Sequence, residues 1–306
     1  MSRRGFTLIE LMVVASIFAT LFGIVLTVGR PSSTGQVKQA AQSIASVLLS
    51  AQSRALGNPS GAGVILDPAG GTAVTTVSAA DMLPMITGLC TGGMPPSDLA
   101  ATTANVSIQP DNADPADLAN GYKIRFQEQD SQGVQPPTAW LRFASGAVSF
   151  RGGNGQTGGT NGNTIWPRPV GGGTFNVWIA RYPNKGQTLY DLPKGVAIDL
   201  PRSGVGTSGT FGAASGAIAL TFDSLGEVDA VLSLSGTPQP VNPSAPIYLL
   251  VATRSDIDAN TSLSTDRSLW VVVHPQTGRV SVSSNVPAAD VAAARAKARQ
   301  GIAIGK

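Results

Sequence analysis

Glu10 is the one charged side chain in an apolar stretch that runs from Phe6 to Val28. A carboxylate within a membrane-spanning helix costs roughly 2.5 to 3.5 kcal/mol at the bilayer centre and less near an end, so it usually has a partner. A cut after Gly5 would free the α-amino group of Phe6. That cation would lie at the right depth to pair with Glu10 of a neighbouring copy, and the carboxylate would then serve assembly.

The same stretch has the length of a membrane-spanning helix. Phe6 to Val28 supplies roughly the 20 apolar residues that a helix needs to cross about 30 Å of bilayer core. Arg3 and Arg4 precede it, which favours a cytoplasmic N-terminus and places everything after Arg30 on the outer side. We therefore expect a single-pass inner-membrane protein with its head outside or in the periplasm.

The segment Arg-Gly-Phe-Thr-Leu-Ile-Glu-Leu, followed by the apolar run, resembles the N-terminus of type IV pilins and type II secretion pseudopilins. In that family a membrane peptidase, the prepilin peptidase, cuts at the bond matching Gly5–Phe6 and methylates the new N-terminal Phe6. The acid matching Glu10 serves subunit docking. The resemblance implies a leader at 1–5 and a transmembrane and assembly helix at 6–29.

Two other export signals compete with this interpretation. An ordinary secretory signal has an apolar core of about 7 to 15 residues, followed by a small-x-small cleavage site. Arg3 and Arg4 before Phe6 also suit a twin-arginine signal. Glu10 and the strong apolar run argue against both of these signals.

The composition indicates one anchored globular domain, because 42% of the 306 residues are hydrophobic and 13% are charged. Losing residues 1–5 removes two of the 21 basic residues and leaves 19 against 18 acidic ones. Without an overall basic field, nucleic acid is the less favoured partner. Cys90 is the single cysteine, so we expect a small buried side chain, with an intermolecular bridge as the alternative.

No catalytic constellation is visible in the sequence. His274 is the one histidine, and neither a Ser-His-Asp set nor a metal-ligand cluster accompanies it. Asp111, Asp114 and Asp117 are spaced closely enough to suit calcium, but Pro115 interrupts them and the EF-hand glycine and glutamate are missing. We predict a solvated turn or helix cap there, no metal site, no cofactor and no enzyme.

The chain is predicted to be α+β, with a long N-terminal helix packed on an antiparallel β-rich head, as in pilins. The second half of the helix, at 30–57, is amphipathic, and Pro31 can kink it. Its apolar positions recur at helical spacing: Val37, Ala41, Ile44, Val47, Leu48, Ala51 and Ala55. Gly57 and Asn58-Pro59 end it.

The head is expected at 58–286, with a loop-rich insertion at about 69–174, and a C-terminal helix and tail at 287–306. Glycine-rich residues 152–173 are expected to be an irregular loop and not a phosphate cradle. The final third is predicted to be an antiparallel meander. The expected strands are 63–66, 122–127, 140–150, 175–182, 195–200, 217–222, 227–232, 247–252, 269–274 and 280–283.

The end of the head carries a second resemblance. Leu-Thr-Phe-Asp-x-x-Gly, then an apolar strand, then Val-His-Pro-x-Thr-Gly-Arg-Val within 195–283 is similar to GspH/FimT-like minor pseudopilins. Some FimT-like minor pilins bind DNA through a terminal Gly-Arg-x-Arg motif; here Ser281 stands at the second basic position. On this resemblance, the residues that would contact DNA are Arg279, Arg295, Lys297 and Arg299.

The basic C-terminal residues also have a simpler interpretation, as favourable charges at the end of a helix capped by Asn285, with Asp290 in its first turn. We therefore predict a structural minor pilin or pseudopilin that assembles with other pilin subunits. The alternative is a DNA- or substrate-binding minor pilin. The sequence favours neither a secretion pseudopilus nor a pilus, and fixes neither tip nor shaft position.

Overall fold

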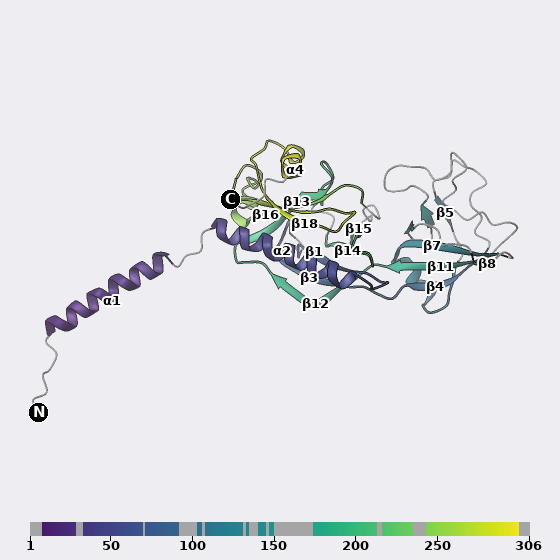
Figure 1. The fold of residues 1–306 in the computed structure, drawn as a ribbon, viewed down its shortest axis with the longest axis horizontal. Coiled ribbons are helices and arrows are strands. Elements are labelled where there is room, and N and C mark those ends of the chain that lie inside the picture. The colour runs from purple at the N-terminus through teal and green to yellow at the C-terminus, as the bar shows by residue number, and fades with distance from the viewer. Residues whose placement is uncertain are drawn as a thin grey trace, which may run out of the picture.

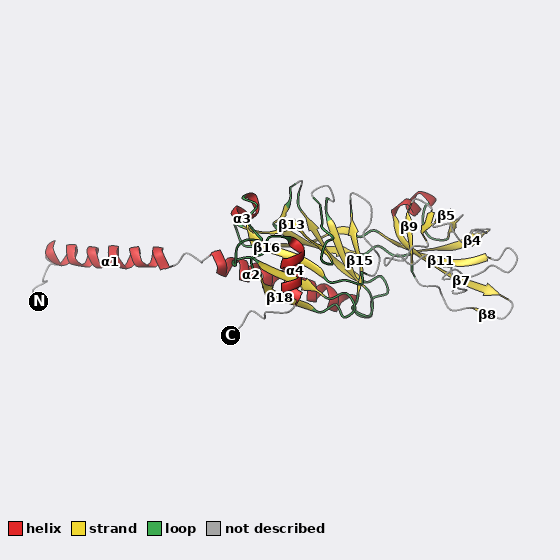
Figure 2. Cartoon of the chain, turned by 90° about the horizontal axis from the view of Figure 1, so that it is seen from above, coloured by secondary structure: helices red, strands yellow, loops and turns green. Residues whose placement is uncertain are grey.

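Two helices begin the chain in the computed structural model, which describes residues 8–28, 33–69, 71–91, 103–105, 108–130, 133–134, 140–144, 147–149, 174–212, 216–234 and 243–299. Helix α1 spans Leu8–Val28 and helix α2 spans Ser33–Ala55. One long helix was expected; the residues between the two, including Pro31, lie outside the described part. Figures 1 and 2 show α1 apart from the rest of the chain. Among the described residues, no helix combines the length and apolar character that crossing a membrane requires.

Helix α2 confirms the amphipathic prediction. One face is buried along its length, and Gly57 follows it with φ +76°, a conformation that glycine adopts without strain. The buried residues are Val37, Ala40, Ala41, Ile44, Val47, Leu48, Ala51 and Ala55. This stripe attaches the N-terminal part of the chain to the head.

Three sheets follow, and every strand pair within the described residues is antiparallel, which confirms the α+β class. Sheet A has the order β12-β3-β1-β14-β15, and sheet B has the order β18-β17-β16-β13-β2. The strands of sheet A are β1 (Ala62–Asp67), β3 (Thr76–Asp81), β12 (Asn184–Asp191), β14 (Ile218–Phe222) and β15 (Val228–Ser233). Those of sheet B are β2 (Ala73–Val74), β13 (Val196–Val205), β16 (Ile247–Thr253), β17 (Leu269–Val273) and β18 (Val280–Ser284).

The main core lies where α2 meets sheets A and B. It combines the buried stripe of α2 with residues such as Val64 and Leu220 of sheet A and Leu249 and Val271 of sheet B. Strands β16 and β17 are buried on both faces, which explains their continuous apolar sequences. The helix therefore closes a core that neither sheet could bury alone.

The third sheet, which we call the insertion sheet, corrects the expectation of a loop-rich segment at 69–174. Its order is β5-β10-β9-β7-β11-β4-β6, with β8 paired to β7. It has its own core, which includes Cys90, Phe126 and Phe175, and Cys90 is buried as predicted. Its elements are β4 (Ile86–Thr91), β5 (Thr103–Asn105), β6 (Ile108–Pro110), the 3₁₀ helix η1 (Pro115–Asn120), β7 (Gly121–Asp130), β8 (Gly133–Val134), β9 (Leu141–Ala144), β10 (Ala147–Ser149) and β11 (Thr174–Arg181).

The segment 69–120 looked like a loop because its strands are short and rich in alanine, threonine and glycine. Strand β3 nevertheless pairs with β1 and β12, and β4 pairs with β11. Strand β12, which the sequence reading missed, is exposed at most positions and therefore lacks an apolar signature. The glycine-rich residues 152–173 lie outside the described part.

The predicted meander at the end of the head is only partly present. Strands β16, β17 and β18 do follow one another in sheet B, but the hairpin of β14 and β15 belongs to sheet A. A local turn pattern predicts which strands form a hairpin and cannot say which sheet the hairpin joins. The chain therefore crosses between sheets twice in this region.

The two predicted turns, 223–226 and 275–278, are confirmed and meet each other. The amide of Gln52 on α2 donates to the carbonyl oxygens of Gly226 (2.9 Å) and Thr277 (3.0 Å). Gly226 and Gly278 both have positive φ, +82° and +61°. A Cβ on Gly278 would collide with the Gly226 carbonyl, so this close approach of the two turns requires glycine.

The remaining helices are short. Helix α3 spans Arg254–Asp258, and helix α4 spans Val291–Arg299. The proposed cap of α4 was wrong: Asp290, not Asn285, accepts from the Ala293 amide at 2.7 Å. Asn285 is instead buried, where it accepts from the Trp270 indole and donates to the carbonyls of Leu263 and Thr265.

Candidate functional site

The N-terminal residues expected to carry processing and assembly lie in or before α1. Gly5 and Phe6 fall outside the described residues, and Glu10 lies in the first turns of α1. The side chains that the structure describes on this helix, between Leu8 and Leu21, are mainly apolar and exposed, with Leu8 78% and Phe18 66% exposed. A helix that is apolar on all faces is normally buried in a membrane or between other helices.

The four basic residues predicted as DNA contacts are not brought together as a group. Arg279 and Arg299 are exposed and line one depression of about 400 Å³ with His274. Lys297 is exposed on α4, and its amine lies 3.4 Å from the Pro287 carbonyl oxygen. Arg279 and Arg299 therefore share a surface depression, and Lys297 lies on α4 together with Arg299.

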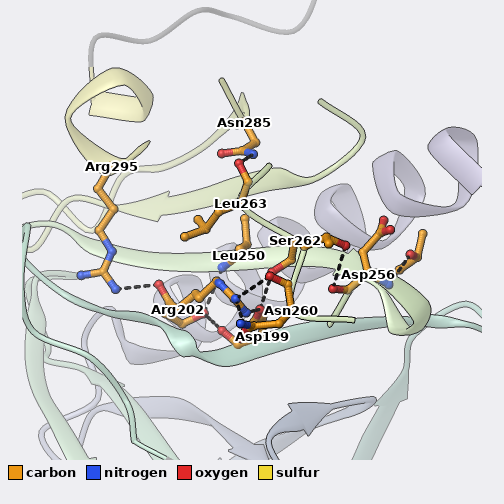
Figure 3. A network of polar contacts seen from close by, with 12 residues as sticks. Asp199, Arg202, Leu250, Asp256, Asn260, Ser262, Leu263, Asn285 and Arg295 are labelled. Carbon is orange, nitrogen blue, oxygen red and sulfur yellow. Dashed lines mark hydrogen bonds and ion pairs between the residues drawn. The ribbon is translucent and has the colours of Figure 1, made fainter. Parts of the chain in front are cut away.

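Arg295 corrects that prediction, because its side chain is fully buried. Its guanidinium donates to the carbonyl oxygens of Arg202, Gly206 and Gly209, each at 2.7 Å, and Figure 3 shows it pointing from α4 toward Arg202. Burial lowers the pKa of Arg295 to about 10. In this fold Arg295 fastens α4 to the end of β13 and is not available to a ligand at the surface.

A polar network next to Arg295 was not found from the sequence. Asp199 on β13 is fully buried and accepts hydrogen bonds from Arg202 (2.7 Å) and from the Ser262 hydroxyl, while Arg202 also reaches Asn260 (Figure 3). The second oxygen of Asp199 is buried without a partner among the described residues. The contacts of Asp199 and Arg202 with Asn260 and Ser262 hold the 259–263 loop against sheet B.

The segment that contains Asp111, Asp114 and Asp117 forms a turn and a helix cap. Asp114 caps η1 by accepting from the Ala116 amide at 2.9 Å, and Asp117 lies 3.6 Å from Arg181. These contacts give two of the three aspartates local structural roles. Within the described parts of the chain, no group of three or more His, Cys, Asp or Glu side chains could hold a metal ion.

The comparisons with known proteins bear on the N-terminus. Residues 1–26 match a family model described as the prokaryotic N-terminal methylation motif. No curated protein and no solved structure matched the chain. The motif implies processing by prepilin peptidase and assembly with other pilins. The sequence at 1–26 therefore supports a type IV pilin-like protein.

Proposed function

We propose that the chain is a minor pilin or pseudopilin, a structural subunit of a type II secretion pseudopilus or a type IV pilus. Prepilin peptidase cuts between Gly5 and Phe6 and methylates Phe6. The subunit is held in the inner membrane by its N-terminal helix, with the N-terminus cytoplasmic, until it enters the filament. The role is structural and not enzymatic. The observation that carries the proposal is that the methylation motif at residues 1–26 includes most of α1.

The exposed surface of α1 supports this role. Nine large apolar side chains on the helix are about half exposed or more: Leu8, Ile9, Leu11, Met12, Val13, Val14, Ile17, Phe18 and Leu21. Each contributes roughly 1.5 to 3 kcal/mol when it is removed from water, so leaving all of them in water would cost on the order of 10 kcal/mol. Lipid supplies this cover before assembly, and the helices of neighbouring subunits supply it afterwards.

The contrast between α1 and α2 fits the same role. The apolar stripe of α2 is already buried in the main core, so α2 belongs to the head. Helix α1 lies apart from that core, at the end of the molecule opposite the insertion sheet (Figures 1 and 2). One helix therefore holds the head together, while the other is available to partners.

Intact-mass and N-terminal determination of the protein from native membranes tests the processing step. We expect a mature chain that starts at a methylated Phe6. A chain that starts after Gly29, or anywhere in the head, would mean ordinary signal cleavage and would contradict the proposal.

Glu10→Ala is expected to reduce recovery of the subunit in a purified filament fraction by about tenfold or more. The reason is that the α-amino group of a neighbouring Phe6 would lose its partner in an apolar setting, where an unpaired charge is strongly unfavourable. Glu227→Ala is the matched control, because Glu227 is an exposed glutamate in the head. Equal recovery of the Glu10 variant and the wild type would rule out the proposed docking role.

A second candidate function is DNA binding by the head, which the shared depression of Arg279 and Arg299 favours. We expect the double variant Arg279→Ala/Arg299→Ala to be retained less strongly on DNA. If each arginine contacts one phosphate, the slope of log affinity against log salt concentration should be shallower by about 2. Arg254→Ala, an exposed arginine on α3, is the control. Absence of wild-type retention at low salt would eliminate DNA as a ligand.

A further inference from the structure

A cleft of about 400 Å³ lies where the insertion sheet meets sheet A. One wall comes from the insertion sheet and includes Arg125, Trp140 and Trp178, while the other includes the turn that contains Asp223 and Leu225. Met82, Leu83 and Met85 add an apolar rim. The volume is in the range of small-ligand sites, and the lining combines apolar surface with a few charges, as such sites do.

The pairing of three neighbouring strands places the key side chains in a row. Arg125 on β7 is directly opposite Trp178 on β11. On the other side of β7, Ile124 is opposite Leu141 at the start of β9, so Trp140 comes next to Arg125. Because side chains alternate along a strand, Ile124 enters the buried core while Arg125 faces the cleft.

The two indole rings hold the guanidinium of Arg125 between them. Its central carbon lies 4.9 Å from the centroid of the Trp140 ring and 4.9 Å from that of Trp178. Such contacts stabilise a cation and restrict its orientation, while they leave the N–H groups at its edge for an acceptor. Arg125 is partly buried, and this burial lowers the pKa of its guanidinium.

Arg125 has no acceptor within the part of the chain that the structure describes. Its Nε is buried without a hydrogen-bond partner, and no carboxylate forms an ion pair with it. The other cations of the cleft differ in this respect: Lys123 is paired with Asp229, and Arg181 lies 3.6 Å from Asp117. A partly desolvated guanidinium without an anion is an arrangement that a carboxylate completes well, since the two groups match in a two-point geometry.

The floor of the cleft is fixed before any ligand arrives. Asp229 on β15 accepts from Lys123 and, at 2.8 Å, from the Tyr122 hydroxyl, both on β7. This buried cluster joins sheet A to the insertion sheet. The Lys123 ammonium also lies 4.5 Å from the Trp140 ring centroid, so the indole contacts two cations of β7.

We propose that this cleft binds an acidic segment of a partner polypeptide, with a carboxylate on Arg125 and neighbouring apolar side chains against the methionine and tryptophan surfaces. A single carboxylate fits better than a polyanion, because Asp223 also lines the cleft and repels further negative charge. This proposal concerns the head alone and does not depend on pilin-type assembly. A failure of either proposal therefore leaves the other standing.

The test uses the full chain in neutral detergent and two probe peptides that differ in one charge, acetyl-Leu-Glu-Leu-amide and acetyl-Leu-Gln-Leu-amide. We expect the glutamate peptide to bind at least about tenfold more tightly, as measured by calorimetry, since a charge-assisted hydrogen bond is lost in the other. Arg125→Gln should remove this difference. Arg254→Gln, which changes an exposed arginine on α3, should leave it unchanged.

Arg125→Lys is the second variant, in case the glutamine variant does not fold. It keeps the charge but loses the planar fork, so we expect an intermediate preference for the glutamate peptide. Equal affinity for both peptides, no binding of either, or an Arg125→Gln variant that still prefers the glutamate peptide would overturn the proposal. Binding of a ten-residue thymidine oligonucleotide that depends on Arg125, without peptide binding, would replace it with a nucleic-acid site.

Discussion

Arg295→Ala is expected to lower the free energy of unfolding of the head by about 3 kcal/mol. The substitution removes the donor from three partly buried carbonyl oxygens, those of Arg202, Gly206 and Gly209, and a loss of about 1 kcal/mol for each is at the low end of the range for buried groups. It also removes a large side chain that packs near the rings of Tyr248 and Trp270. Part of this loss is offset, because burying the cation is itself unfavourable, and this burial lowers the pKa of Arg295.

Denaturant unfolding monitored by circular dichroism measures this effect. The matched control is Lys297→Ala, two residues away on the same helix, where an exposed side chain makes one weak contact and the expected change is within about 0.5 kcal/mol. Arg295→Met should fall between the two, because it restores packing but not the donors. An Arg295→Ala variant as stable as the lysine control would mean that α4 is not fastened by Arg295.

The burial of Arg295 could have been predicted from the sequence. Val291, Ala294, Arg295 and Ala298 stand at helical spacing, and the structure buries the last three of them. The sequence reading gave weight to charge and placed Arg295 with Lys297 and Arg299 as surface groups. Helical periodicity distinguishes them, since positions three and four apart share a face and positions two apart do not.

The parts of the fold that the sequence predicted well are those set by local pattern. The stripe of α2, the strands β13, β16, β17 and β18 of sheet B and both glycine turns depend on periodicity and turn chemistry within a few residues. The motif at residues 1–26 is likewise a local sequence signal. Sheet membership depends instead on pairings across long stretches of sequence, such as β2 with β13 and β4 with β11, and no local pattern specifies these.

The cleft was missed for the same reason. The alternation of Lys123, Ile124, Arg125 and Phe126 does show which side chains share a face of β7. It cannot show that Trp178, more than 50 residues later, stands opposite Arg125. The row of Trp140, Arg125 and Trp178 therefore forms only when β9, β7 and β11, which are separate in the sequence, pair with one another.

Asp229→Asn is expected to destabilise the head by about 3 to 5 kcal/mol, because it leaves Lys123 as a buried cation without a counter-charge. The side chains of the pair are only 7% and 8% exposed. Burial is the largest cause that raises the pKa of Tyr122, and it persists in the variant, so the phenol stays a neutral donor and cannot replace the lost charge. Denaturant unfolding at neutral pH measures the loss.

Asp67→Asn provides the matched control, since Asp67 pairs with Lys185 at 2.7 Å but the two side chains are 30% and 50% exposed. An exposed pair of this kind contributes about 0 to 1 kcal/mol, so the same chemical change should cost little there. The double variant Lys123→Met/Asp229→Leu should recover much of the stability lost in Asp229→Asn, because it removes both charges together. Equal losses in the two asparagine variants would mean that the cluster joining sheet A to the insertion sheet is solvated, and the pre-formed floor of the cleft would then have no physical basis.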